Sequence, residues 1–195
     1  MNFAVLASGS GSNLQAIIDA KKKGRICGDL RVVFSDKPDA PALERARKAG
    51  VKVVVSLRPA DYPSREAFDT ALIDILVREK IGLVVLAGFM RLLSPVFIKA
   101  FPFKIINIHP ALLPEFKGAH AVRDALAAGV KTTGVTVHFV DEEVDHGPII
   151  AQVPVKVRPK DTQATLLARL HQAEHKLYPD VLDRLLRGKI RAPER

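Results

Sequence analysis

The 195-residue chain has a single cysteine, no tryptophan and no run of eighteen apolar residues. One cysteine can form neither an intramolecular disulfide nor a zinc site rich in thiolates, and we expect Cys27 to be a small, buried or half-buried side chain. The chain has no apolar run long enough to cross a bilayer and no basic region before its first apolar segment. We therefore expect a cytoplasmic protein that does not act at a membrane.

Positive charge exceeds negative charge, with 30 lysines and arginines against 21 acidic residues and a formal net charge of +9. The excess comes mainly from residues 21–60 and from basic residues near the C-terminus. These clusters lack interleaved aromatic residues on which bases could stack, so we expect no nucleic-acid partner. A basic surface also attracts phosphorylated small molecules. We expect small-molecule substrates and a monomer or homodimer.

Short apolar runs alternate with segments of helical spacing in the first half of the chain. Strands are expected at 3–7, 30–34, 51–55, 83–87 and 105–109, and helices from Leu14 onward, at 42–49 and at 65–79. A helix at 118–128, strands at 133–140 and 149–157, and a last helix from Asp161 or Thr162 through Leu177 follow, with Pro179 able to interrupt it before 181–186. This order predicts one α/β domain over 1–195, an open, mostly parallel Rossmann-like sheet with helices on both faces and an antiparallel or mixed C-terminal part.

A glycine-rich loop, Ser8-Gly9-Ser10-Gly11-Ser12-Asn13, follows the first expected strand and precedes a helix. Gly9 and Gly11 allow close approach of the backbone to an anion, and the N–H groups of Ser12 and Asn13 would start a helix whose positive end favours phosphate. The dinucleotide pattern G-x-G-x-x-G is broken by Leu14, and no Walker lysine is present. The loop favours a phosphate site, and a tight turn with serine caps is the alternative.

Asn107 and His109 stand two residues apart at the end of an expected strand, before Pro110. In an extended strand both side chains point to the same face, with Ile106 and Ile108 packed behind them. An amide N–H can hold an oxyanion, and an imidazole can handle a proton near neutral pH. The pair predicts an active site at this strand end, against the alternative of a hydrogen-bonded structural histidine.

An acidic loop over 141–148 contains Asp145 and leaves through Gly147-Pro148. A carboxylate near His109 would orient the ring and favour the imidazolium. Spacing alone does not bring the two side chains together, so a solvated acidic loop is the alternative.

His171-Gln172-Ala173-Glu174-His175 matches the H-x-x-E-H zinc-peptidase signature, with both histidines on one helix face. No third ligand is evident, so a polar helix face is favoured over a zinc hydrolase. His138 alternates with apolar strand residues and is expected to be a partly exposed strand histidine. His120 follows Gly118 and either lines the cleft or caps a helix.

Four motifs in sequence order, Ser8 to Leu14, Leu86 to Arg91, Asn107 to Pro114 and Asp145 to Pro148, resemble those of the phosphoribosylglycinamide formyltransferase family. The resemblance covers nearly the whole chain and extends through Glu174-His175-Lys176-Leu177-Tyr178-Pro179. It implies transfer of a formyl group from 10-formyltetrahydrofolate, as cosubstrate, to the amino group of glycinamide ribonucleotide in purine synthesis. No metal is required by this chemistry.

By this resemblance, Asn107, His109 and Asp145 form a catalytic trio, with protonated His109 and Asn107 stabilising an oxyanion. Substrate-binding residues would be Gly11, Ser12, Asn13 and Glu174. Folate-binding residues would be Arg65, Met90, Arg91, Leu92, Leu93, Val140 and Val144. Residues 1–100 would supply the phosphate-binding half, and 101–195 the catalytic and folate-binding half.

Two relatives with the same transfer domain are set aside by length, because methionyl-tRNA formyltransferases and formyltetrahydrofolate deformylases carry an extra domain that 195 residues would not hold. His146 departs from the small residue that relatives often have beside the aspartate. A zinc hydrolase centred on His171 and His175 and a non-catalytic nucleotide-binding module remain the alternative functions.

Overall fold

The computed structural model describes residues 1–191, and residues 192–195 of the expected domain lie outside the described part. Seven strands form one sheet: β1 (Asn2–Leu6), β2 (Asp29–Ser35), β3 (Val53–Ser56), β4 (Ile81–Leu86), β5 (Ile105–His109), β6 (Thr132–Phe139) and β7 (Ile149–Lys156). The helices are α1 (Ser12–Lys22), α2 (Pro41–Lys48), α3 (Arg65–Arg78), α4 (Pro95–Ala100), α5 (Ala121–Ala127) and α6 (Gln163–Leu186), with a short 3₁₀ turn η1 (Pro59–Asp61).

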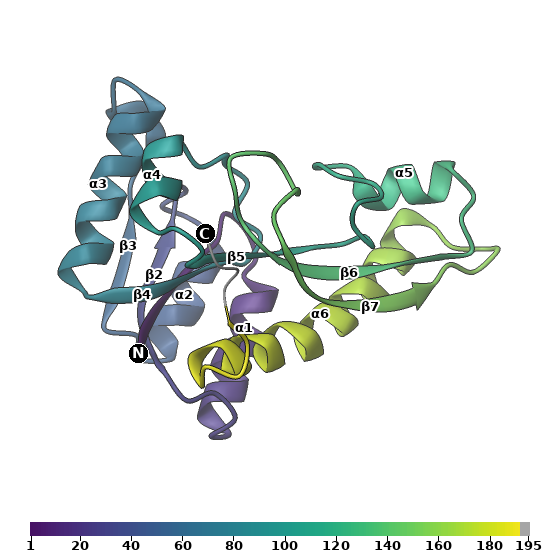
Figure 1. Ribbon diagram of the computed structural model, residues 1–195, viewed down its shortest axis with the longest axis horizontal. Coiled ribbons are helices and arrows are strands. Elements are labelled where there is room, and N and C mark those ends of the chain that lie inside the picture. The colour runs from purple at the N-terminus through teal and green to yellow at the C-terminus, as the bar shows by residue number, and fades with distance from the viewer. Residues whose placement is uncertain (192–195) are drawn as a thin grey trace.

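The strand order is β3-β2-β1-β4-β5-β6-β7. The first five strands in this order pair in parallel, and β5-β6 and β6-β7 pair antiparallel. Figure 1 shows β6 and β7 with α5 extending away from the parallel part. The predicted α/β sheet with an antiparallel C-terminal part is therefore confirmed.

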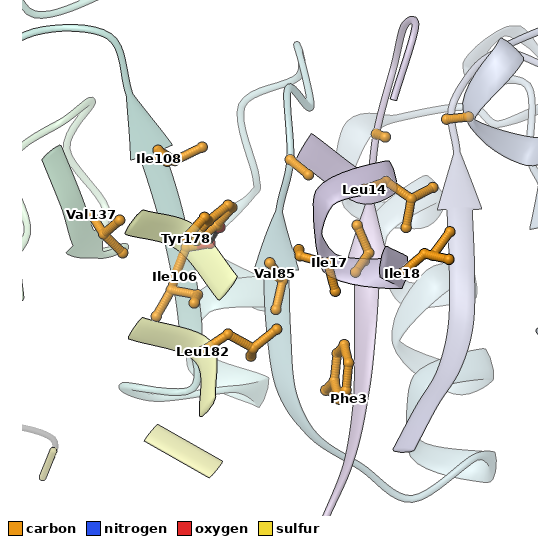
Figure 2. Close-up of a cluster of buried hydrophobic side chains, with 14 of the residues drawn as sticks. Phe3, Leu14, Ile17, Ile18, Val85, Ile106, Ile108, Val137, Tyr178 and Leu182 are labelled. Atoms are coloured by element: carbon orange, nitrogen blue, oxygen red, sulfur yellow. Dashed lines mark hydrogen bonds between the residues drawn. The ribbon is translucent and has the colours of Figure 1, made fainter. Parts of the chain in front are cut away.

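Apolar side chains form two clusters, one on each face of the sheet. The larger cluster joins α1, α2 and α6 to one face, with Leu14, Ile17 and Leu182 packed near Val85 and Ile106 (Figure 2). The smaller cluster packs α3 and α4 on the opposite face. Neighbouring residues of a strand alternate between the two clusters, as the pleat requires, so every central strand is covered on both faces.

Three details differ from the sequence predictions. Pro179 lies inside α6 and does not interrupt it. A proline in a helix interior costs about 3 kcal/mol because it lacks a backbone donor, and the burial of Tyr178, Val181 and Leu182 around it outweighs this cost. Cys27 is exposed, not buried, since it lies in the link between α1 and β2. The short helix α4 was not predicted.

The order of strands reverses between β1 and β4, and the loops after these two strands are bonded together. Ser8 donates its backbone N–H to Gly88 O (3.0 Å), and the Ser8 Oγ accepts from Met90 N (2.9 Å). The carboxyl edge at such a reversal is where open α/β sheets bind ligands. The fold thus places the glycine-rich loop and the loop after β4 at one edge.

Position 11 requires a glycine. Its φ of +73° lies in the left-handed region, and a Cβ there would lie 2.8 Å from the Ala42 Cα and Cβ atoms of α2. Only glycine fits this combination of backbone angle and close approach, so the start of α1 is fixed against α2. Among residues 1–191, no helix has the length and apolar character needed to span a bilayer.

Candidate active site

Strand β5 presents Asn107 and His109 on the same face of the sheet, as predicted. Cross-strand pairing with β6 sets Asn107 opposite His138 and His109 opposite Thr136. Directly paired residues share a face, so four polar side chains gather on one side while Ile106 and Ile108 pack in the apolar cluster behind them. His109 and His138 are both buried, at 5% and 2% exposure.

His109 is held between a carbonyl and a carboxylate. Its Nε2 lies 2.8 Å from the Phe116 carbonyl oxygen, and its Nδ1 lies 3.3 Å from Asp145 Oδ2. A carbonyl only accepts, so Nε2 carries a hydrogen and Nδ1 is the position that gains or loses a proton. Burial lowers the pKa of His109, against the opposing effects of the Asp145 carboxylate and the Phe116 carbonyl.

Asp145 is the centre of the polar cluster. Its Oδ2 accepts from Gly118 N at 2.8 Å, and its Oδ1 lies 3.4 Å from Asn107 Nδ2 and 3.6 Å from His138 Nε2. Burial acts to raise the pKa of this carboxyl, but the contacts with His138, Gly118 and His109 outweigh it and the pKa is lowered. Asp145 is therefore ionised at neutral pH.

The backbone of Asp145 adopts φ of +49°. A non-glycine residue in the left-handed region costs of order 1–3 kcal/mol and persists where its surroundings fix it. The following Gly147 packs so closely on the Phe139 carbonyl at the end of β6 that a Cβ would collide with it. The acidic loop thus holds Asp145 in one pose against β5 and β6, which spacing alone did not establish.

The loop after β5 is tied down by Thr136 of β6. The Thr136 hydroxyl donates to Ala111 O (2.6 Å) and accepts from Leu113 N (3.1 Å), and Gln152 Nε2 donates to Leu113 O (2.9 Å). This network fixes the segment that goes on to supply the Phe116 carbonyl to His109.

A cleft of about 390 Å³ opens over these side chains. Asn107, His109 and Asp145 line it together with all seven residues for which the family resemblance implies folate binding: Arg65, Met90, Arg91, Leu92, Leu93, Val140 and Val144. Met90, Leu92 and Val144 are exposed apolar side chains on its rim. The Arg91 guanidinium lies 4.7 Å from the Phe68 ring centroid, a cation–π contact that orients it. Residues from both the 1–100 half and the 101–195 half of the sequence line this cleft.

Glu174 and Asn13 meet although they are 161 residues apart in the chain. Asn13 Nδ2 donates to Glu174 Oε2 at 2.8 Å, and both side chains are buried. Burial raises the pKa of Glu174. Gly11 caps α1 without a side-chain capping bond, and Ser12 is half-buried at the first turn. These four residues come together at the start of α1.

The zinc alternative gains no support. His171 and His175 stack, with ring centroids 6.1 Å apart, and Glu174 between them is bonded to Asn13. Within residues 1–191, no group of three or more histidine, cysteine, aspartate or glutamate side chains is arranged to hold a metal ion.

His138 is the residue that sequence analysis missed. It was expected to be partly exposed, but it is buried beside Asn107 and Asp145. The signal was present in the alternation of β6: if β6 pairs with β5, the polar positions 136 and 138 share the face of Asn107 and His109. His120 is exposed at the start of α5, makes no side-chain cap there and does not line the cleft.

His146, beside Asp145, contacts Asp141 of the same loop. Its Nδ1 lies 2.8 Å from Asp141 Oδ2, and both side chains are partly exposed. It therefore closes the acidic loop on its outer side.

Comparison with known proteins agrees with this architecture. A family model described as formyl transferase matches residues 1–182. The phosphoribosylglycinamide formyltransferase of Escherichia coli K12 is 46% identical over 194 residues, covering 100% of this chain and 91% of that protein. The human trifunctional purine biosynthetic protein adenosine-3 is 44% identical over 98% of this chain, which spans 19% of that longer protein.

A solved structure shows the same likeness. The glycinamide ribonucleotide transformylase 1 of Symbiobacterium toebii superimposes with a TM-score of 0.96 at 49% identity, covering 100% of this chain and 92% of that one. With a family model over residues 1–182 and a relative that is 46% identical over 91% of its own length, the chain belongs to the formyl transferase family.

Proposed function

We propose that the protein transfers the formyl group of 10-formyltetrahydrofolate to the amino group of N1-(5-phosphoribosyl)glycinamide in de novo purine synthesis. The products are the formylated ribonucleotide and tetrahydrofolate. The choice of this reaction within the family is supported by the names of full-length relatives at 44–46% identity.

One observation carries the proposal: Asn107, His109 and Asp145 lie in contact with one another and line one cleft. Asp145 Oδ2 lies 3.3 Å from His109 Nδ1, and Asp145 Oδ1 lies 3.4 Å from Asn107 Nδ2. In acyl transfer to an amine, negative charge develops on the carbonyl oxygen and a proton must move. The amide N–H of Asn107 can stabilise that charge, and the imidazole and carboxylate of His109 and Asp145 can move the proton.

In the proposed reaction, the lone pair of the neutral amine attacks the formyl carbon and the carbonyl π pair moves to oxygen. Asn107 donates an N–H to that oxyanion. The C–N10 bond then breaks, its electron pair goes to N10, and the oxyanion becomes a carbonyl again. N10 gains one proton and the former amine loses one, so the protons balance.

His109 and Asp145 would relay this proton. The family resemblance implies that His109 is protonated from the start, whereas burial acts to lower its pKa. We propose that the resting ring is neutral, with no hydrogen bond across the 3.3 Å between its Nδ1 lone pair and Asp145 Oδ2. Nδ1 then accepts the proton released by the amine, the imidazolium donates to Asp145, and the proton is returned toward N10. The lowered pKa of Asp145 supports this assignment, because an ionised carboxylate stabilises the imidazolium.

Substrate positions follow from the rest of the site. Gly11, Ser12 and Asn13 at the start of α1 would bind the phosphate and ribose, because a helix N-terminus favours an anion, with Glu174 near the amino end of the ribonucleotide. The cleft lined by Met90, Leu92 and Val144 would take the folate, with Arg65 at its rim near the glutamate tail.

The setting of the reaction is part of the proposal. The chain would act in the cytoplasm as a single domain, monomeric or homodimeric, on small molecules, without metal, nucleic-acid or membrane partners.

The test is formyl transfer to glycinamide ribonucleotide by chelator-treated protein, with Asn107→Ala beside the wild type. We expect wild-type turnover without metal. Loss of activity on chelation, restored specifically by zinc, would favour a zinc enzyme instead. Binding of the ribonucleotide without any transfer by folded protein would leave a nucleotide-binding module and remove the catalytic assignment.

A further inference from the structure

His138 is buried beside Asn107, and its tautomer can be read from its contacts. Its Nδ1 lies 2.8 Å from the carbonyl oxygen of Phe139, the next residue. Because a carbonyl oxygen only accepts, Nδ1 must carry a hydrogen. In the neutral ring the other nitrogen, Nε2, then has a lone pair. Its nearest polar neighbour is Asn107 Nδ2 at 3.2 Å, whereas Asp145 Oδ1, at 3.6 Å, lies beyond hydrogen-bond distance.

That lone pair faces the Asn107 amide. His138 Nε2 lies 3.2 Å from Asn107 Nδ2, and β5 pairs with β6 so that the two residues are directly opposite. An Nε2 acceptor selects the amide orientation in which Nδ2, and not Oδ1, turns toward it. The two ends of an asparagine amide have the same shape, so such a neighbour decides which one points where.

Asp145 selects the same orientation independently. Its Oδ1 lies 3.4 Å from Asn107 Nδ2. If the amide were turned by 180°, its carbonyl oxygen would face an ionised carboxylate, and two acceptors cannot share a hydrogen bond. The two hydrogens of Nδ2 are therefore directed to different partners, one to His138 and one to Asp145, and the latter contact is long.

From these contacts we propose that His138 is a positioning residue that fixes the Asn107 amide with its N–H groups toward the reacting centre. His138 holds one hydrogen, and the second, which makes only the long 3.4 Å contact with Asp145, is left to donate to the formyl oxygen as negative charge develops there. This inference rests on the proposed function, in which Asn107 donates to the oxyanion. It adds a residue that acts through Asn107.

The backbone around His138 is arranged to keep its tautomer. The pairing of β6 with β7 shifts register between Val137 and His138, and such irregularities re-aim side chains next to active sites. The turn after Asp145 packs on the same Phe139 carbonyl that accepts from His138, since a Cβ at Gly147 would collide with that oxygen. The Phe139 carbonyl thus contacts both the acidic loop and His138, and His138 in turn contacts Asn107.

The first test reads the tautomer in the free protein. Long-range ¹H–¹⁵N correlation spectra of uniformly ¹⁵N-labelled protein at neutral pH distinguish a protonated ring nitrogen from one with a lone pair. We expect His138 in the Nδ1–H form, with an Nε2 signal that moves toward that of an unbonded lone pair in Asn107→Ala. An Nε2–H ring, or an Nε2 signal unaffected by Asn107→Ala, would overturn the proposal.

The second test compares two variants of the same position. His138→Leu removes the acceptor, and His138→Gln keeps a carbonyl oxygen near the place of Nε2. In His138→Leu we expect kcat to fall by about 10²-fold with KM for both substrates little changed, within the roughly 10²–10³-fold that loss of an oxyanion donor costs. In His138→Gln most of kcat should return.

Coupling to Asn107 completes the test. If His138 acts through Asn107, adding His138→Leu to Asn107→Ala should cost almost nothing further. Equal losses in the Leu and Gln variants, or the same fold-loss in both backgrounds, would show a role independent of Asn107 and overturn the proposal. The tautomer measurement needs neither substrate nor a foldable His138 variant, so it succeeds or fails separately from the proposed function.

Discussion

Replacing Asp145 with asparagine removes a charge from the centre of the site while keeping its shape. The Asp145 carboxylate lies 3.3 Å from His109 Nδ1. At an effective dielectric constant of about 20, a unit charge pair at this distance attracts by about 5 kcal/mol. Since about 1.4 kcal/mol of barrier is tenfold in rate, this sets an upper limit of nearly four decades on the loss.

The neutral amide oxygen retains part of the hydrogen bonding, so we expect kcat of Asp145→Asn to fall by about 10²- to 10⁴-fold, the range typical of acid–base groups. The Asp145 carboxylate is also a cause that raises the pKa of His109. Its removal lowers that pKa further, and the acid limb of the remaining activity should move to lower pH, because neutral His109 is the form that accepts the proton.

The assay follows tetrahydrofolate formation by absorbance at saturating ribonucleotide, with far-UV circular dichroism to confirm the fold. Asp124→Asn, a change in an exposed carboxylate of α5 paired with Arg123, is the matched control and should behave as the wild type. A folded Asp145→Asn variant with kcat within about tenfold of the wild type, or an acid limb that moves to higher pH, would refute the proton relay.

Three further predictions concern stability. Gly11→Ala places a Cβ against the α2 backbone at a left-handed φ and should lower the free energy of unfolding by about 1–3 kcal/mol, measured by thermal denaturation. The control is Gly9→Ala, where a Cβ meets nothing within 4 Å and the stability should be nearly unchanged. Equal losses of stability in the two variants would contradict the close approach of Gly11 to α2. Because burial raises the pKa of Glu174, its contribution to stability is present at low pH and lost as pH rises through that pKa. Glu174→Gln should therefore gain stability relative to the wild type as pH rises above the ordinary pKa of a glutamate, about 4.3, and a stability difference that does not change with pH in urea denaturation would exclude this. Tyr178→Phe removes a buried hydroxyl that reaches Leu86 O (2.8 Å) and Ile106 O (3.1 Å); we expect a loss of about 1–3 kcal/mol, and an unchanged midpoint of thermal unfolding would show that these carbonyls need no donor.

Much of the fold could be predicted from the sequence because alternation of apolar runs and helical spacing is a local signal. The strands on which the site depends, β4 and β5, are apolar runs bounded by Gly88 and Pro110. The failures have physical causes. At Pro179 the local preference of one residue was overridden by the packing of the buried face of a long helix.

The site was predictable only in part from its residues. The period of a strand brings Asn107 and His109 together, but the approach of Asp145 depends on a loop pose that came from family resemblance. His138 was missed because its role depends on the pairing of β6 with β5. A strand pattern fixes which residues share a face, and not which neighbouring strand they meet.

The central claim is that His109 moves the proton in formyl transfer. Its most direct test is single-turnover transfer from 10-formyltetrahydrofolate to glycinamide ribonucleotide by chelator-treated protein, comparing wild type with His109→Ala. We predict a loss of at least about 10²-fold in the transfer rate, with binding of the ribonucleotide retained. Transfer by folded His109→Ala at a rate near that of the wild type would contradict the account.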